Sequence, residues 1–119
     1  TMFTKNTLMD LFKKNEKRNF QIYTNIAYGR GINGVSYHSF VGDSYLDDDR
    51  RKFGNICSIK GFGETYLVIE YKGEDNKYYY CDVPKEIYIP YDAIVMVDFI
   101  TDESNKFYGF TGKHNFTEL

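Results

Sequence analysis

The chain has 119 residues, which suits one domain with a hydrophobic core that needs neither disulfides nor a metal to fold. Its hydrophobic content of 42% and charged content of 27% exclude a disordered chain, and its net charge of −2 excludes binding to polyanions by bulk charge. The composition includes 12 Tyr and 10 Phe but only two alanines, Ala27 and Ala93, so it favours strands over helices. We therefore expect a single α+β domain over residues 1–119, built mostly of antiparallel strands.

Residues 5–17 are predicted to form one N-terminal helix. Leu8, Leu11 and Phe12 recur at helical spacing within this range, and polar residues occupy most of the remaining positions. The end of the predicted helix and the residue after it are basic: Lys13, Lys14, Lys17 and Arg18. Positive charge at this end suits the negative pole of the helix dipole.

Strand-like segments follow the helix as far as the C-terminal region. They cover residues 20–28, 35–41, 56–62, 65–72, 77–83 and 93–100, with shorter candidates at 86–89 and 107–111. Asn33-Gly34 predicts a type I′ hairpin turn between the first two, and the turn at 73–76 predicts a second hairpin over 65–83. Short strands separated by frequent turns indicate a small barrel or sandwich of about six strands, with a C-terminus that frays.

Two prolines restrict one of the short candidate strands. Pro84 and Pro90 bracket residues 86–89, which predicts an edge strand at most. Residues 88–97 then have the pattern of a strand, a one-turn corner and another strand. This ten-residue pattern resembles the closing strands of small SH3-like or Sm-like barrels, which can also carry an N-terminal helix.

The acidic, polar segment over residues 42–54 is the first candidate contact site. Three consecutive acidic residues suggest a calcium-binding loop: Asp47, Asp48 and Asp49. The EF-hand pattern fails, because Lys52 and Ser58 occupy the positions where such a loop requires Gly and Glu. We interpret the segment as a charged contact loop for a protein partner.

The hairpin over residues 65–83 is the second candidate, because it is rich in tyrosine and acidic residues. Tyr78 and Tyr80 lie on one side of the same strand, and Glu74 and Asp75 lie in the preceding turn. Tyrosine is enriched in the residues that dominate protein interfaces. The acidic neighbours disfavour base stacking as an alternative, since they would repel phosphates.

Nucleic-acid binding remains an alternative through one basic patch, if the fold assembles it. Its residues would be Lys13, Lys14, Lys17, Arg18, Arg50, Arg51 and Lys52. The glycine-rich residues 29–34 have the spacing of a dinucleotide-binding loop, but a strand follows them where that loop requires a helix. They are interpreted as a hairpin turn.

Catalysis is the third possibility, through a site around His38, placed mid-strand, and an aspartate of the following loop. No catalytic motif accompanies it, which favours a non-enzymatic role. The cysteines Cys57 and Cys81 lack zinc-site spacing and are expected to be buried thiols in strands, so we expect no cofactor and no metal. The absence of a signal peptide and of a long apolar run predicts a cytoplasmic location without membrane contact.

These observations favour a non-enzymatic binding protein that docks a protein partner. One form of that function is a small acidic inhibitor of host machinery from a mobile element. Residues 1–53 carry a net charge of +3 and residues 54–119 a net charge of −5, which also permits head-to-tail self-association.

Overall fold

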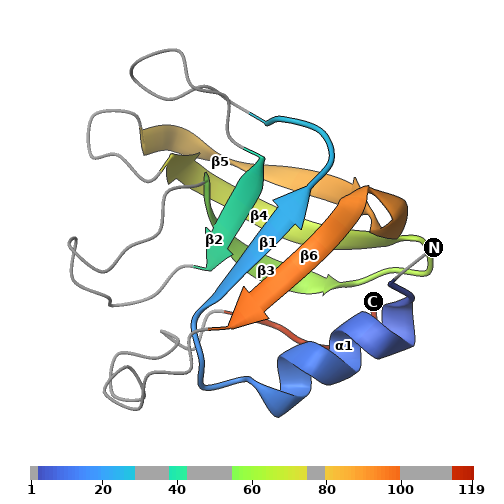
Figure 1. Ribbon diagram of the computed structural model, residues 1–119. Coiled ribbons are helices and arrows are strands. Elements are labelled where there is room, and N and C mark those ends of the chain that lie inside the picture. The colour runs from blue at the N-terminus through green and yellow to red at the C-terminus, as the bar shows by residue number, and fades with distance from the viewer. Residues whose placement is uncertain (1–2, 29–37, 43–54, 75–79, 100–113) are drawn as a thin grey trace.

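A computed structural model of the chain describes residues 3–28, 38–42, 55–74, 80–99 and 114–119. The described residues form one α-helix, six strands and a short 3₁₀ turn (Figure 1). In chain order these are α1 (Lys5–Lys14), β1 (Phe20–Thr24), β2 (Ser39–Gly42), β3 (Asn55–Phe62), β4 (Tyr66–Glu74), β5 (Tyr80–Pro90), η2 (Tyr91–Ala93) and β6 (Ile94–Phe99). The predicted α+β class is confirmed.

The helix begins where the sequence predicts and ends three residues earlier. Thr4 caps its start, with the Thr4 hydroxyl accepting a hydrogen bond from the Thr7 amide at 3.2 Å. Asn15 ends it: the Asn15 side-chain amide donates to the Leu11 carbonyl at 2.8 Å, and its backbone N–H bonds to the same last turn. Asn15 is the C-cap with a non-helical backbone conformation, so the basic residues after Lys14 lie outside the helix.

The six strands form one mixed sheet in the order β5-β4-β3-β2-β1-β6. Every neighbouring pair is antiparallel except β2 and β3, which are parallel. In the described part of the chain, β5 and β6 are the two ends of this sheet, so it is open and does not form the closed barrel that was one of the two predicted architectures.

The parallel pair gives the segment over residues 43–54 a topological role. Phe40 lies opposite Asn55, and Gly42 lies opposite Cys57, so the chain must return from the end of β2 to the start of β3. Parallel neighbours need such a crossover of about a dozen residues, whereas antiparallel neighbours can be joined by two. The length of this segment is therefore required by the fold and is not by itself a sign of function.

The predicted hairpin over residues 65–83 is confirmed as the antiparallel pair β4 and β5, but β5 is longer than expected. It continues through Pro84 to Pro90, so residues 86–89 are not a separate strand. The pairing register shifts between Tyr71, opposite Lys85, and Gly73, opposite Tyr80. Proline is tolerated here because β5 is an end strand and the register shift falls beside it.

The corner predicted after Pro90 is present as η2, which joins the two end strands of the sheet. Tyr91 in η2 is buried, and its hydroxyl donates to the Gly63 carbonyl at 2.6 Å. The predicted strand–corner–strand pattern over residues 88–97 is therefore confirmed, while the parallel β2–β3 pair and the open sheet depart from a closed barrel.

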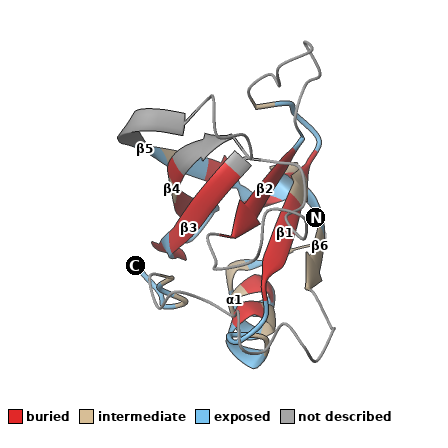
Figure 2. Cartoon of the chain, turned by 90° about the vertical axis from the view of Figure 1, so that its left-hand side faces the viewer, coloured by how far each residue is buried: buried red, intermediate tan, exposed pale blue. Residues whose placement is uncertain are grey.

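The core lies between α1 and the sheet, and Phe12 is at its centre. The Phe12 ring lies 4.9 Å from Phe20, 5.4 Å from Phe99, 5.5 Å from Phe116 and 5.9 Å from Phe62, measured between ring centroids. The buried residues follow the inner side of α1 and the central strands (Figure 2). Cys57 is buried in β3, as predicted for that cysteine.

Strand β1 is shorter than predicted. It ends at Thr24, whose hydroxyl donates to the Ile26 carbonyl at 2.6 Å and helps turn the chain away from the sheet. Ile26, which falls within the longer predicted strand, is 69% exposed. The corresponding start of the predicted second strand, and the turn at residues 29–34, lie outside the described residues.

The C-terminal residues 114–119 are held against β3 and do not fray. The Phe62 amide donates to the Thr117 carbonyl at 2.9 Å, and the Leu119 amide donates to the Phe62 carbonyl at 3.0 Å. An added Cβ at Gly61 would lie 3.2 Å from the Thr117 carbonyl oxygen, so glycine permits this close approach. The segment runs parallel to the second half of β3, beyond the part that pairs with β2.

Candidate functional site

The predicted partner-binding residues are only partly placed by the structure. Glu74 ends β4 and Tyr80 begins β5, so both lie at the far end of the hairpin. The other predicted contacts lie outside the described residues: Asp47, Asp48, Asp49, Asp75 and Tyr78. The contact sites at the hairpin turn and the acidic segment therefore stay predictions, whereas the body of the same hairpin lies within the described residues.

Two exposed tyrosines lie on the outer face of the hairpin body. Tyr66 in β4 is 37% exposed and Tyr88 in β5 is 55% exposed, and their rings meet edge to face at 5.3 Å between centroids. Tyr66 is opposite Pro90 and Tyr88 is opposite Val68, so the two tyrosines are diagonal neighbours on one face. Val68 of β4, directly opposite Tyr88 on this face, is buried, so the two rings flank a packed side chain.

Two glutamates continue this face along the same strands. Glu70 and Glu86 are directly opposite each other in the β4–β5 register. Like charges at directly opposite positions destabilise an antiparallel pair. Lys60 on β3 partly offsets this, since its Nζ lies 3.7 Å from a Glu70 carboxylate oxygen. We call Tyr66, Glu70, Glu86 and Tyr88 the tyrosine–glutamate surface.

The electrostatics of this surface favour hydrogen-bond donation from tyrosine. The Glu86 carboxylate, followed by partial burial, raises the pKa of Tyr88 above its usual value. The raised pKa keeps the Tyr88 hydroxyl protonated at neutral pH, and this hydroxyl shares a side-chain hydrogen bond with Glu86. The two carboxylates accept hydrogen bonds only, so the surface combines aromatic area, a donor and two anionic acceptors.

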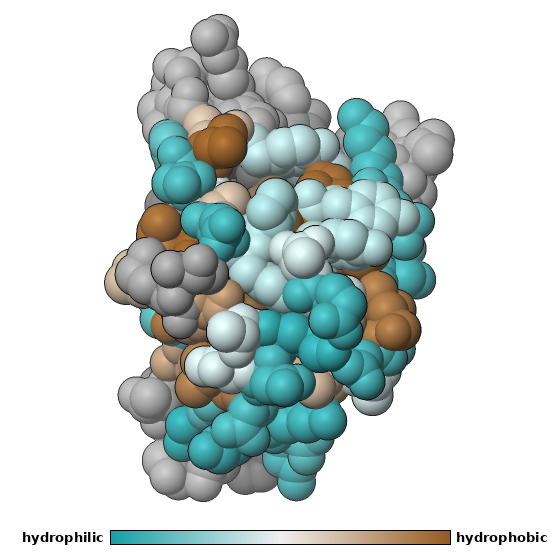
Figure 3. All heavy atoms as spheres, turned by 90° about the vertical axis from the view of Figure 1, so that its right-hand side faces the viewer, coloured by the Kyte–Doolittle hydropathy of each residue, from teal (hydrophilic) through white to brown (hydrophobic). Residues whose placement is uncertain are grey.

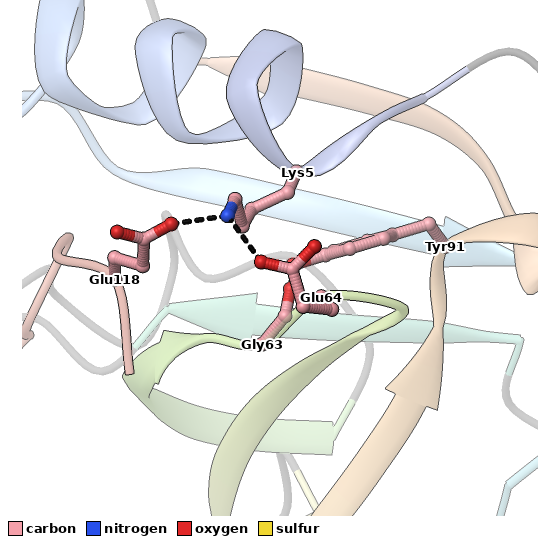
Figure 4. A network of polar contacts seen from close by, with 5 residues as sticks. All are labelled: Lys5, Gly63, Glu64, Tyr91 and Glu118. Atoms are coloured by element: carbon pink, nitrogen blue, oxygen red, sulfur yellow. Dashed lines mark hydrogen bonds and ion pairs between the residues drawn. The ribbon is translucent and has the colours of Figure 1, made fainter.

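A polar network holds the adjoining turn between β3 and β4 in place (Figure 4). The Lys5 ammonium at the start of α1 lies 2.6 Å from a Glu64 carboxylate oxygen and also pairs with Glu118 of the C-terminal segment. These carboxylates raise the pKa of Lys5, and Lys5 lowers the pKa of Glu118. A lysine held protonated in this way is a poor nucleophile, so we assign the network a positioning role.

This network is continuous with the tyrosine–glutamate surface through Gly63. The Gly63 amide donates to the Tyr66 carbonyl at 2.9 Å, and the Gly63 carbonyl accepts the Tyr91 hydroxyl. Burial raises the pKa of Tyr91 to about 12, which keeps that hydroxyl a donor. An added Cβ at Gly63 would lie 2.7 Å from the Tyr66 ring, so glycine is what allows the ring its position.

A second polar cluster links β2, β1 and β6. The Tyr23 hydroxyl lies 3.0 Å from both a Gln21 and an Asp98 side-chain oxygen, and the Gln21 amide donates to the Ser39 hydroxyl at 3.0 Å. Burial and the bond to Asp98 raise the pKa of Tyr23. A protonated phenol bound to acceptors supports strand pairing here, because it is neither a base nor an activated nucleophile at neutral pH.

Four basic residues of the nucleic-acid alternative are exposed at the end of α1 and just after it, and two of them have local partners. Lys14 lies 3.1 Å from Asp10, and Arg18 donates to the Asn15 side chain at 2.9 Å. Lys13 and Lys17 are exposed beside them. Whether these residues form one patch with Arg50, Arg51 and Lys52 stays a prediction, because those three lie outside the described residues.

The two histidines have different surroundings. His38 is exposed and immediately precedes β2, so its predicted mid-strand position is wrong. Its carbonyl accepts the Thr24 amide at 2.7 Å, a backbone contact that involves no imidazole chemistry. His114 accepts the Ile59 amide at Nδ1 at 3.0 Å and stacks on Phe116, so it helps fix the C-terminal segment to β3.

The surface around the β3–β4 turn and the β5–β6 corner is mainly hydrophilic or near neutral, with apolar atoms in separate places (Figure 3). Among the described residues, no group of three or more His, Cys, Asp or Glu is arranged to hold a metal ion. In the same residues, no helix has the length and apolar content to cross a membrane. Comparison with protein-family models, curated proteins and solved structures finds no match.

Proposed function

We propose that the chain is a non-enzymatic binding domain that docks a protein partner through the outer face of the β4–β5 hairpin. The observation that carries this proposal is the exposed Tyr66–Tyr88 pair on a packed strand base. Tyrosine is over-represented among the residues that dominate interface energies, because its large ring loses little conformational entropy on binding. A small acidic inhibitor of host machinery is one form that this function would take.

The frame beneath this surface also supports a binding role. Gly63 joins Tyr66 to a hydrogen-bonded network that spans α1, the β3–β4 turn and the C-terminal segment. A contact surface held by several elements needs less ordering when a partner arrives, which improves affinity without new contacts. The proposal places the partner on the hairpin body and leaves room for further contacts toward the hairpin turn.

The nucleic-acid alternative uses the opposite charge and a different part of the molecule. Glu70 and Glu86 would repel phosphates, whereas Lys13, Lys14, Lys17 and Arg18 would attract them. Binding through that basic end should weaken steeply with salt and survive loss of the tyrosines. These opposite dependences separate the two functions.

The test is an affinity capture from extracts of the source organism, with and without nuclease. The wild-type chain is compared with a Tyr66→Ser/Tyr88→Ser variant and with Ile26→Ser, which removes an exposed apolar side chain elsewhere. We expect a stoichiometric protein that survives nuclease, is kept by Ile26→Ser and is lost by the double variant. Retention of the same protein by the double variant, with its fold intact by circular dichroism, would contradict the proposal.

A further inference from the structure

We propose that the tyrosine–glutamate surface recognises an arginine side chain presented by the protein partner. This inference rests on the proposed function, because it names the chemistry that the same surface accepts. Its basis is the combination of two opposed carboxylates with an exposed aromatic pair on one face of β4 and β5.

The carboxylates point to a cation. Glu70 and Glu86 are opposite each other, and directly opposed side chains in an antiparallel pair have Cβ atoms about 4.5–5.5 Å apart. Like charges at directly opposed positions destabilise the strand pair, and a cation bound by both glutamates would reduce that repulsion. Binding a cation is therefore favoured twice, by the new attraction and by the relief of the existing repulsion.

The chain already contains a partial substitute for that cation. Lys60 reaches Glu70 at 3.7 Å from the neighbouring strand, close to the limit for an ion pair. With one ammonium against two carboxylates, these three side chains keep a net negative charge. Lys60 would compete with an incoming cation for Glu70, which predicts that its removal strengthens binding.

The aromatic pair selects arginine among cations. Tyr88 follows Glu86 by two residues on the same face of β5, Tyr66 meets it edge to face, and both tyrosines remain exposed to solvent. A planar guanidinium can stack on an exposed tyrosine ring while its N–H groups bond to carboxylates at its edge. The lysine ammonium lacks this plane and is more strongly hydrated, so it gains less at the same surface.

The test is an NMR titration of the ¹⁵N-labelled chain with three tripeptides, acetyl-Gly-Xaa-Gly-amide, in which Xaa is arginine, lysine or the uncharged citrulline. We expect saturable amide shifts at Tyr66, Glu70, Glu86 and Tyr88 with the arginine peptide, weaker ones with lysine and none with citrulline. Glu86→Gln should weaken arginine binding by about threefold to tenfold, and Lys60→Met should strengthen it by about twofold to fivefold.

Several outcomes would overturn the inference: equal shifts with arginine and citrulline, no saturable shifts at these residues, or unchanged affinity in Glu86→Gln. The substituted positions are exposed or half-exposed, and circular dichroism confirms that each variant folds. The captured partner separates this inference from the proposed function. A partner that is lost by Tyr66→Ser/Tyr88→Ser but fully retained by Glu70→Gln/Glu86→Gln would support docking on this face. The same result would refute recognition of an arginine side chain by the two glutamates.

Discussion

Replacing Phe12 with alanine tests whether α1 is fixed to the sheet by the aromatic core. Phe12 is 0% exposed and has four aromatic rings within 6 Å. Removal of a buried phenylalanine side chain costs about 3–5 kcal/mol, from lost transfer energy and from the cavity left behind. A domain of this size has about 5–15 kcal/mol in total, so Phe12→Ala should lower the melting temperature by roughly 12–20 °C.

The assay is urea unfolding followed by far-ultraviolet circular dichroism and by tyrosine fluorescence. Lys13→Ala is the matched control on the same helix, because Lys13 is exposed and its loss should change the free energy of unfolding by less than about 0.5 kcal/mol. Alanine has a higher helix propensity than phenylalanine, so any loss in Phe12→Ala must come from packing. Similar free energies of unfolding for the two variants would refute the packing of α1 on the sheet.

Three further predictions concern the hairpin and its support. Glu86→Lys should raise the free energy of unfolding, by a few tenths to about 1 kcal/mol, because it replaces a like-charge pair with an attractive one opposite Glu70; a decrease in urea unfolding would contradict the register. The stability advantage of wild type over Tyr91→Phe should be largest below pH 10 and shrink as pH rises toward 12, because folding raises the pKa of Tyr91 from 10.0 to about 12. A constant difference across that pH range, measured by urea unfolding, would show that Tyr91 ionises equally in both states. Gly63→Ala should displace the Tyr66 ring and so weaken partner binding, measured by calorimetry, while the fold is kept. An unchanged affinity would show that Tyr66 is not part of the binding face.

Much of the local structure could be predicted from the sequence, because local patterns carry it. The spacing of Leu8 and Phe12 predicts the buried side of α1, and the turn at residues 73–76 predicts the β4–β5 pair. The corner at η2 was also visible in the pattern around Pro90. In each case the determining residues are close together in the chain.

Non-local features could not be predicted in the same way. The sequences of β2 and β3 do not indicate that these strands pair in parallel, because the neighbour of each strand depends on how the whole sheet assembles. The passage of β5 through Pro84 is tolerated because β5 is an end strand and a register shift falls beside it, which the local sequence does not reveal. The retention of residues 114–119 likewise depends on a free stretch of β3 and on Gly61.

The candidate site shows the same division. The sequence indicates the tyrosine-rich, acidic hairpin, but the predicted contacts centre on its turn, whereas the described surface lies on its body. Alternation along β4 and β5 could have grouped Tyr66 with Glu70 and Glu86 with Tyr88, because residues two or four apart share a face. The pairing of Glu70 with Glu86 needed the register, and the position of Tyr66 needed Gly63 and its network.

The most direct test of the central claim is site-specific photo-crosslinking in extracts of the source organism. The photoreactive amino acid p-benzoylphenylalanine replaces Tyr88 in one variant and Ile26 in another, both exposed in the free chain. Docking through the outer face of the β4–β5 hairpin predicts one dominant crosslinked protein from position 88 and none of that protein from position 26. Crosslinking of the same protein from position 26 but not from position 88 would contradict the proposed docking face.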